Sequence, residues 1–580
     1  MSNKMKRYIL FIVFALCLLL LVSCSADVDD GMIGGDTEEG TTDDVQHPYN
    51  CAFEQKGDEQ RISVSWNKNA NIKRVDIEVK HGDMTVSDTT IRGEVLSRGY
   101  AEVDAFYGRH EVSVTVVGTD GRIENKTEEI SIVCDEYVIA PISGSMPQLY
   151  FTLYMNEITN NYTTPAFVWL TRPGSWNWDR LPENVYTVPT VDVREALQHD
   201  NYNRMIEATD AYIEELYSID PDAKFKLYIN DYNLYLYPKL MAANGIPEEN
   251  YRVVLLSDGG SSYSEFNRAF NSDDENFDAD AKYADMAEKL DALLYEVREV
   301  KDYNWIYDFK VDTNEIRQYA YVAAKEKNNV EWWVLRPRAN QTLYSPDKEF
   351  LDSVMADVVT DPEDAEDPVI VERNFATPLS LMTDEQRAAL KEFYNFNDEM
   401  FSEAISQKKK VMMFLGSWAD EYNEPDFEAY VKLMKKYFGD EFVYYYKGHP
   451  STPTSNHPEK AAQLEACGLI DVESSINAEL ILFFYPDIYM CGYNSSTFMS
   501  ANKDEMACAI FGMRAKDCMD DYKSRVGLFV SKITDFTEFP ECEGNLHEYF
   551  LIEYNRIESK YEYSVYDATE DVIFGGPLRT

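Results

Sequence analysis

Positive charge is scarce in this sequence. Its 580 residues include 54 lysines and arginines against 103 aspartates and glutamates, which gives a formal charge of −49 at pH 7. Proteins that bind nucleic acid present a basic face to the phosphates, so this balance argues strongly against nucleic acid as a partner. It also predicts weak long-range attraction of an anionic substrate. Exposed charges are screened beyond about 8 Å at physiological salt, so cations inside a cleft can still set the local field.

Short signatures of several enzyme classes are absent as well. The sequence has no Gly-x-Gly-x-x-Gly, Walker A, Gly-x-Ser-x-Gly or His-Glu-x-x-His pattern. Nine cysteines are present, but none forms a Cys-x-x-Cys pair, and no histidine cluster accompanies them. Spacings of that kind are what zinc sites require. We therefore expect no metal site of a recognisable type.

The N-terminal residues 1–23 have the pattern of a signal peptide. A basic start at residues 4–7 is followed by an apolar run over 8–22, which is shorter than the roughly 20 residues of a membrane-spanning helix. The run closes with Leu21-Val22-Ser23-Cys24, a pattern typical of a bacterial lipobox. It predicts cleavage before Cys24 and lipidation of that thiol, the alternative being an ordinary signal peptide with an incidental cysteine. Several acyl chains anchor a protein stably, so we expect an exported protein of the cell envelope, anchored to the outer membrane.

Residues 24–47 are rich in Gly, Thr and acids, and they predict a disordered tether. Polar and apolar residues then alternate in short runs over 48–137, with turn residues between the runs. This pattern predicts a small β-sandwich of immunoglobulin or fibronectin type, with Trp66 in its core. Cys51 and Cys134 flank this module, and in an exported chain they predict a disulfide, although two free thiols are the alternative.

Beyond residue 141, strand-like and helix-like segments alternate, which predicts parallel α/β sheets. Residues 147–155 are expected to form a strand in this series. A second series begins near residue 408, so we predict an N-terminal Rossmann-like domain over 145–407 and a C-terminal one over 408–580. A pair of this kind is a GT-B-type fold. Ligands of open parallel sheets bind beyond the carboxyl ends of the strands, so the loops after the strands are where a site is expected.

Two groups of polar residues directly follow predicted strands. Ser257-Asp258-Gly259-Gly260 follows a run of apolar residues, and Asp258 there is either a catalytic carboxylate or a turn and helix cap. Lys447-Gly448-His449-Pro450 follows Phe-Val-Tyr-Tyr-Tyr. Imidazole can donate a proton near neutral pH, and Lys447 could place positive charge near a phosphate. The alternative is a loop histidine bonded to the backbone.

Two further candidates lie nearer the C-terminus. Asn494-Ser495-Ser496-Thr497 offers consecutive hydroxyls at the expected start of a helix. Such a segment can bind an anion, or it can simply cap the helix. Glu479 could accept hydrogen bonds from two ribose hydroxyls, or it could be a solvated charge at a helix start.

Taken together, these motifs resemble the bacterial sialyltransferases of glycosyltransferase family 80, the Pasteurella and Photobacterium type. The resemblance covers about residues 148–530. It rests on the order Ser257-Asp258-Gly259, Trp418-Ala419, Lys447-Gly448-His449-Pro450, Ile476-Asn477-Ala478-Glu479 and Ser495-Ser496, together with the connecting stretch that begins at Thr383. Some Photobacterium members also carry a lipoprotein signal and an immunoglobulin-like module.

The resemblance implies an inverting sialyltransferase that moves sialic acid from CMP-sialic acid to a galactoside-type hydroxyl. CMP-sialic acid would be a co-substrate, with no cofactor and no metal, and the partners would be this donor, an oligosaccharide acceptor and the membrane. Asp258 would be the base and His449 the acid. Lys447, Gly448, Pro450, Glu479, Ser495 and Ser496 would bind the donor, and Trp418 and Asn230 the acceptor.

The sequence departs from the family pattern at two places. Ser257 stands where the family usually has the first of two aspartates, and a Gly-Thr-Thr-Thr-Trp run is shortened to Gly416-Ser417-Trp418. Two other functions therefore stay open. One is a glycosyltransferase of the same fold that uses another CMP-keto-sugar, and the other is a surface lipoprotein that binds glycans without catalysis.

Overall fold

The computed structural model describes residues 49–55, 60–155, 158, 162–189, 191–192, 199–272, 274, 276–299, 313–335, 343–360, 369–373, 375–416, 431, 435, 439–450, 453–485, 487–492, 497, 508–514, 549–555, 560–566 and 572–577. The chain divides into two compact units after Ile132. The predicted signal peptide, Cys24 and the tether fall outside the described residues. In the part that is described, no helix is long and apolar enough to cross a membrane.

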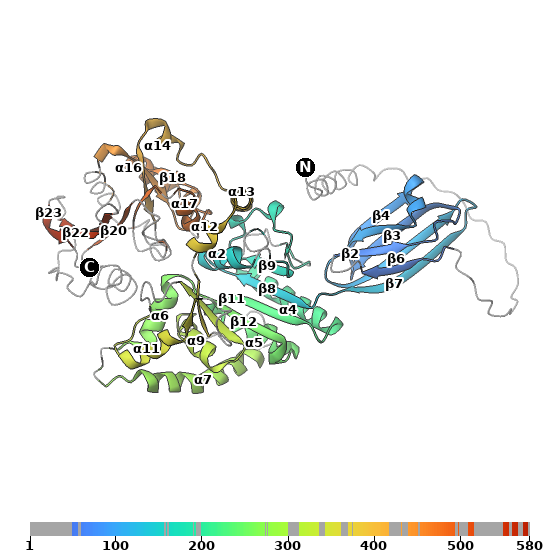
Figure 1. Ribbon diagram of the computed structural model, residues 1–580, viewed down its shortest axis with the longest axis horizontal. Coiled ribbons are helices and arrows are strands. Elements are labelled where there is room, and N and C mark those ends of the chain that lie inside the picture. Colours follow the sequence, from blue (N-terminus) through green and yellow to red (C-terminus); the bar gives the residue numbers. More distant parts are fainter. Residues whose placement is uncertain are drawn as a thin grey trace. The chain divides into compact units, whose positions relative to one another are not determined.

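The first unit is an all-β module of two antiparallel sheets (Figure 1). One sheet has the order β1 (Ala52–Gln55), β2 (Arg61–Ser65), β5 (Tyr100–Asp104). The other has the order β4 (Met84–Arg92), β3 (Ile72–His81), β6 (Gly108–Gly118), β7 (Ile123–Ile132). Alternate residues of β2, β3 and β6 are buried, and Trp66 lies in the core as the alternation predicts.

The predicted disulfide between Cys51 and Cys134 is absent from the structure. Cys51 is a buried thiol that is not in a disulfide. The two cysteines belong to different units, because Cys134 follows the last strand of the module and falls beyond the boundary. The backbone N–H of Cys134 donates to the hydroxyl of Tyr137, a residue of the second unit, at 2.8 Å. Burial raises the pKa of Cys51 to about 11, which keeps this thiol protonated and unreactive.

His110 makes the all-β module sensitive to acid. Its ring is fully buried on β6, and it packs edge-on against Phe106 with ring centroids 4.7 Å apart. Desolvation, with His81 nearby, lowers the pKa of His110 to about 4. In the unfolded chain the pKa of this histidine returns to its ordinary value of about 6.5. Between pH 4 and 6.5 the unfolded chain therefore binds more protons than the folded one. Stability should fall as the pH drops through this window.

We expect the free energy of unfolding of this module to be lower at pH 5 than at pH 7 by about 2 kcal/mol. His110→Phe should remove most of this difference, whereas the control His81→Gln removes only the smaller cause of the pKa shift and should keep most of the difference. Urea unfolding at both pH values measures this difference in the free energy of unfolding. Pulsed hydrogen exchange and mass spectrometry of peptides from β3 and β6 report the unfolding of the module. An equal loss in wild type and His110→Phe would contradict the assignment.

The second unit contains an eight-stranded sheet that is parallel throughout. Its order is β10 (Val185–Tyr186), β9 (Ala166–Leu170), β8 (Glu136–Ile142), β11 (Lys224–Asn230), β12 (Tyr251–Leu256), β13 (Val330–Leu335), β15 (Ile370–Arg373), β14 (Val358–Val359). From β8 the chain first adds strands on one side, and from β11 it adds them on the other. The strand order therefore reverses between β8 and β11, and such a point is where ligands bind.

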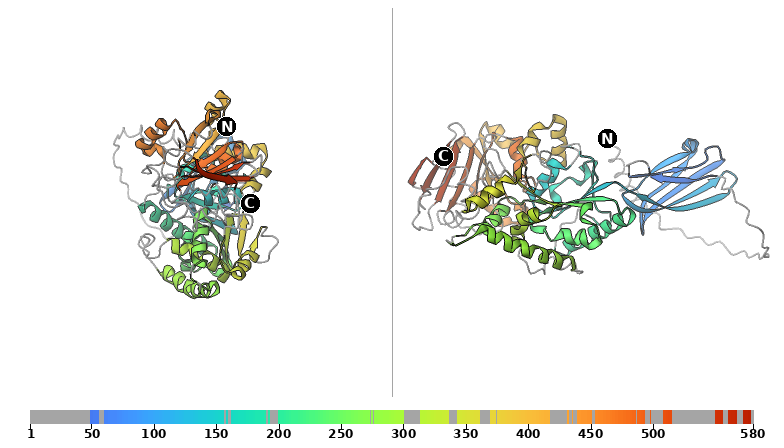
Figure 2. Two further views of the ribbon diagram at one scale, coloured as in Figure 1. Left: turned by 90° about the vertical axis from the view of Figure 1, so that its left-hand side faces the viewer. Right: turned by 60° about the horizontal axis from the view of Figure 1, so that its bottom comes forward.

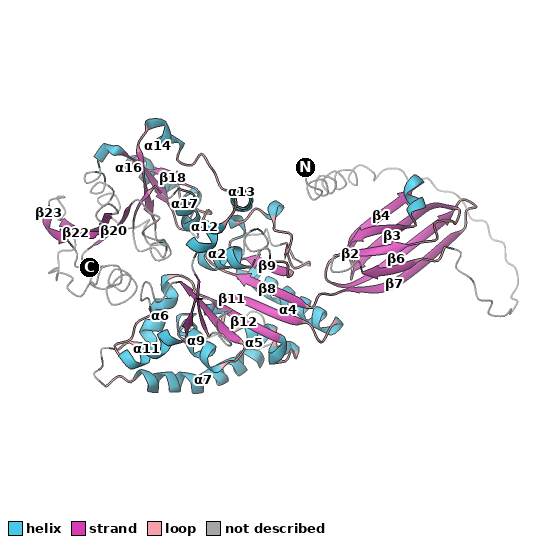
Figure 3. Cartoon of the chain, viewed as in Figure 1, coloured by secondary structure: helices cyan, strands magenta, loops and turns pink. Residues whose placement is uncertain are grey.

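Helices lie beside this sheet in Figure 3. They are α2 (Ser145–Tyr154), α4 (His199–Ile219), α5 (Leu236–Leu240), α6 (Gly260–Phe270), α7 (Ala279–Glu299), α9 (Thr313–Glu326), α11 (Lys348–Ala356), α12 (Ala376–Leu381) and α13 (Asp384–Phe393), whereas the next helix, α14 (Ser402–Gln407), contacts strands of the second sheet described below. Helix α9 packs against α6, α7, β13 and the short helix η4 (Asp231–Asn233). Gly245, in the left-handed conformation, ends the short helix η5 (Ala242–Asn244), and Thr383 and Gln386 form a capping box at the start of α13.

The strand predicted over residues 147–155 is wrong, because this segment belongs to helix α2. Eight consecutive residues of α2 are buried. A helix that is buried on all sides has no polar face, so its sequence lacks the 3.6-residue period and resembles a buried strand. The helix starts directly after Gly144, whose φ of +83° favours glycine.

A second sheet follows in the same unit (Figure 2). Its order is β18 (Ile470–Val472), β17 (Phe442–Lys447), β16 (Lys410–Leu415), β19 (Tyr489–Gly492), β20 (Cys508–Arg514), β21 (Tyr549–Asn555), β22 (Lys560–Tyr566), β23 (Val572–Pro577). The strands are parallel as far as β20 and antiparallel beyond it. Helices α16 (Pro458–Cys467) and α17 (Ala478–Phe484) accompany it. The predicted GT-B-type pair is confirmed, and the antiparallel extension is an addition that the sequence did not suggest.

Candidate active site

Polar residues gather where four neighbouring strands of the first sheet end. Ser143 follows β8, Arg172 follows β9, Asn230 ends β11 and Asp258 follows β12. These strands are adjacent and parallel, so their carboxyl ends lie along one edge of the sheet. This edge includes the point where the strand order reverses, which places the predicted residue Asp258 in the expected position.

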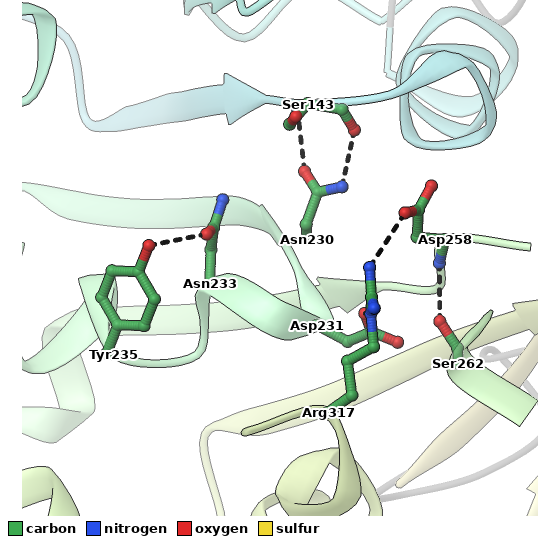
Figure 4. A network of polar contacts seen from close by, with 8 residues as sticks. All are labelled: Ser143, Asn230, Asp231, Asn233, Tyr235, Asp258, Ser262 and Arg317. Atoms are coloured by element: carbon green, nitrogen blue, oxygen red, sulfur yellow. Dashed lines mark hydrogen bonds and ion pairs between the residues drawn. The ribbon is translucent and has the colours of Figure 1, made fainter. Parts of the chain in front are cut away.

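The carboxylate of Asp258 is held from several directions but keeps access to solvent. Its backbone N–H donates to the Ser262 hydroxyl at 2.7 Å, and Arg317 Nη2 donates to its Oδ2 at 3.1 Å (Figure 4). The side chain is 29% exposed. A Cβ atom at Gly144 would lie 2.9 Å from Asp258 Oδ1, so only glycine lets the loop after β8 approach this oxygen. A carboxylate that is held in place and partly exposed to solvent is suited to accept a proton from a bound molecule.

The side-chain amide of Asn230 binds the backbone of Ser143. Its side chain is fully buried. Its Oδ1 accepts from the Ser143 backbone N–H at 2.9 Å, and its Nδ2 donates to the Ser143 carbonyl at 2.6 Å. This amide is committed to the backbone in the structure, and its predicted contact with the acceptor stays a prediction. Asn230 fixes the start of the loop that carries Gly144 against Asp258 (Figure 4).

Lys447, at the end of β17, is also placed differently from the prediction. Its side chain is 4% exposed, and its ammonium donates to the carbonyls of Gly448 and Ser474 at 3.0 and 2.8 Å. Desolvation lowers its pKa to about 8, with nearby acids including Glu479 opposing the shift. Lys447 thus joins the loops after β17 and β18, and it does not offer an exposed charge to a phosphate.

His449 follows Lys447 and Gly448 and is partly buried, as is Pro450. Desolvation, together with the positive charges of Arg172 and Lys447, lowers the pKa of His449 to about 4. The imidazole is therefore neutral near pH 7 in this ligand-free state. A negative group bound between these cations and the ring would oppose their effect and raise the pKa again.

Arg172 is a site residue that the sequence reasoning missed. Burial lowers its pKa, while Tyr232 and Asp258 act in the opposite direction. The same guanidinium lowers the pKa of His449. Arg172 is therefore close enough to interact electrostatically with both Asp258 and His449, which follow strands of different sheets. Its position just after the strand Ala166–Leu170 could have indicated a site residue, but Arg172 is not part of any motif that we used.

Glu479 lies in the first turn of α17 and is 8% exposed. Its Oε1 accepts from the Thr497 hydroxyl at 2.9 Å. Thr497 directly follows Ser495 and Ser496 in the chain, so Glu479 lies near the end of that segment. Ser495, Ser496 and Trp418 themselves fall outside the described residues.

A direct contact joins the two Rossmann-like halves near these residues. Asn477, the N-cap of α17, donates through Nδ2 to the carbonyl of Ser145 at 3.4 Å. Ser145 is adjacent to Gly144, where a Cβ atom would lie 2.9 Å from Asp258 Oδ1. Among the described residues, no group of three or more His, Cys, Asp or Glu side chains is arranged to hold a metal ion.

No protein-family model and no curated protein matches this sequence. Among solved structures, the chain is similar to a 2,6-sialyltransferase from a Photobacterium species in complex with CMP and lactose, at 14% identity and a TM-score of 0.46, with 77% of this chain and 86% of that one covered. It is also similar to an α/β-galactoside α-2,3-sialyltransferase from Photobacterium phosphoreum, at 13% identity and a TM-score of 0.43, with 64% and 88% covered. A putative UDP-N-acetylglucosamine 2-epimerase from Listeria monocytogenes has 8% identity and a TM-score of 0.32, with 63% and 76% covered.

Proposed function

We propose that this chain is an inverting glycosyltransferase that moves sialic acid from CMP-sialic acid to a hydroxyl of a galactoside. One observation carries the proposal most strongly. Asp258 and His449 follow parallel strands that belong to two different sheets, yet Arg172 interacts electrostatically with both. A carboxylate and an imidazole brought together in this way, with a cation beside them, suit a reaction that needs a base, an acid and a site for an anion.

In the proposed reaction, Asp258 accepts the proton of the acceptor hydroxyl. The acceptor oxygen forms a bond to the anomeric carbon of the donor while the bond from that carbon to the phosphate oxygen breaks. His449 donates a proton to the departing phosphate, and the electron pair of the broken bond stays on CMP. A single displacement inverts the configuration of the anomeric carbon.

The neutral state of His449 in the ligand-free chain is consistent with this role. The donor carries a negative phosphate group, and its arrival next to Arg172 and His449 would raise the pKa of the ring from about 4. The acid would thus be charged only when its substrate is bound. Glu479, held by Thr497, is proposed to accept the ribose hydroxyls, with Ser495 and Ser496 binding the phosphate as the motif resemblance implies.

Purified protein incubated with CMP-sialic acid and lactose in EDTA is expected to give sialyllactose, detected by mass spectrometry, with release of CMP. Lactose without donor is the control. Transfer from a different CMP-keto-sugar alone would refute the donor assignment. Binding of the acceptor with no release of CMP from any donor would indicate a glycan-binding protein and would refute the proposal.

A further inference from the structure

A second carboxylate lies close to Asp258, and the reaction described above does not use it. Asp231 begins η4 at the end of β11 and is fully buried. Among the described residues, neither of its carboxylate oxygens has a hydrogen-bond donor in normal geometry. The Ser262 hydroxyl and the Trp332 indole approach it and only partly stabilise its charge. A buried acid without a full set of donors is costly, so its presence needs an explanation.

Arg317 on α9 connects this acid to Asp258. Its Nη2 donates to Asp258 Oδ2 at 3.1 Å, and its Nε lies 3.7 Å from Asp231 Oδ1. The guanidinium also lies over the Tyr232 ring, 4.6 Å from the ring centroid. The Arg317 side chain is only 12% exposed. Stacking of this kind fixes the plane of a guanidinium, so one oriented cation lies between two carboxylates (Figure 4).

We propose that Arg317 and Asp231 are positioning residues for Asp258, with Arg317 orienting the Asp258 carboxylate and Asp231 balancing the charge of Arg317 when Asp258 takes up a proton. This inference rests on the proposed role of Asp258 as the base. Before the reaction, Asp258 neutralises Arg317. Once the proton of the acceptor hydroxyl has moved to Asp258, Arg317 loses the negative charge that it contacts at 3.1 Å, and an ionised Asp231, 3.7 Å from its Nε, compensates for that loss. Ionised Asp231 therefore favours the state in which Asp258 carries the proton.

The surroundings of Asp231 suit this task. Burial raises the pKa of Asp231 to about 7, and the charge of Arg317 opposes that rise while Asp258 adds to it. The other titratable groups that interact with Asp231 are Tyr150 on α2 and Tyr263 on α6, and burial raises the pKa of both, so they remain neutral. Arg317 and Asp258 are thus the charged groups to which Asp231 responds in the described part of the chain. Near neutral pH, Asp231 is close to the midpoint of its titration and can change its charge readily.

Two substitutions with opposite electrostatic effects test the proposal. Asp231→Asn removes a negative charge near Asp258, so the acidic limb of the pH profile of kcat/KM should move to lower pH by about one unit. Arg317→Gln removes a positive charge, so the same limb should move to higher pH, and kcat should fall by about 10² because Asp258 is no longer held in place. The KM for the donor should change little in either variant.

Asp210→Asn is the matched control. Asp210 is also a buried acid, paired with Lys239 at 3.4 Å, but it lies on α4 and is not part of this network. This substitution should lower stability without moving the pH profile. Profiles that stay in place for Asp231→Asn and Arg317→Gln, or that move in the same direction, would show a merely structural role and overturn the proposal.

A readout without catalysis separates failure of this inference from failure of the proposed function. The carboxyl carbons of aspartate can be labelled and titrated by NMR in the ligand-free protein, and the Asp258 resonance is identified by its loss in Asp258→Asn. Its titration should move to lower pH in Asp231→Asn and to higher pH in Arg317→Gln. These opposite movements in a protein that transfers no sugar would support the charge network and refute the base assignment alone. An unchanged titration would refute the network.

Discussion

Asp258→Asn is expected to lower kcat for transfer to lactose by about 10²- to 10⁴-fold, because it removes the group that takes the proton of the acceptor hydroxyl. The substitution keeps the size of the side chain. Arg317 then has an amide oxygen in place of the carboxylate that it now contacts at 3.1 Å. Affinity for CMP should change little, since the base acts on the acceptor. Initial rates and calorimetric titration with CMP measure the two quantities.

The matched control for this variant is Asp222→Asn. Asp222 is exposed and precedes β11 at its amino end, whereas the candidate site lies at the carboxyl ends of the strands. Its replacement should leave kcat unchanged. Wild-type activity in Asp258→Asn would remove Asp258 from the mechanism, and an equal loss in Asp222→Asn would show that the effect is not specific to the site.

His449→Ala is expected to slow transfer from CMP-sialic acid by about 10²-fold or more, because CMP would leave without a proton. The loss should shrink with a donor whose leaving group needs no protonation, such as para-nitrophenol, provided that this donor binds. Asp258→Asn should not be rescued in this way. Equal rescue of both variants would contradict the separate roles. His457→Ala is the control, since His457 lies on the next loop beside Glu459 and outside the proposed site.

The pH dependence of the wild-type protein gives a second check on His449. Its pKa is lowered to about 4 in the ligand-free chain, and the bound donor phosphate should raise it. The basic limb of the pH profile of kcat reports the pKa of the acid in the donor-bound protein. The basic limb of the profile of kcat/KM reports the pKa of the acid in the free protein. The basic limb of kcat should therefore lie at higher pH. Coincident limbs in wild type, or the same separation in His449→Ala, would refute the assignment.

The sequence predicted the fold class and the location of the main polar residues because both depend on local patterns. Alternating segments indicated the all-β module, and buried apolar runs followed by polar loops placed Asp258 and His449 at strand ends. Helix α2 was predicted as a strand because complete burial removes the polar face that gives a helix its period.

The remaining parts of the candidate site depend on which strands become neighbours, and no local pattern carries that information. Arg172, Asp231 and Arg317 surround Asp258 because β8, β9, β11 and β12 lie together in the sheet and α9 packs beside η4. Lys447 and Asn230 were assigned to substrate by motif alone. Only the structure shows that their polar groups are already bound to backbone carbonyls and amides.

The central claim is that Asp258 and His449 act together in one displacement at the anomeric carbon of CMP-sialic acid. Proton NMR of a running reaction with CMP-sialic acid and lactose tests it most directly, because it follows the donor, the product and its anomeric configuration at the same time. The account predicts one molecule of CMP for each sialyllactose formed and a product with the configuration opposite to that of the donor. With Asp258→Asn, CMP and sialyllactose should form at least about 10²-fold more slowly. A product that retains the donor configuration, or full product formation by Asp258→Asn, would contradict it.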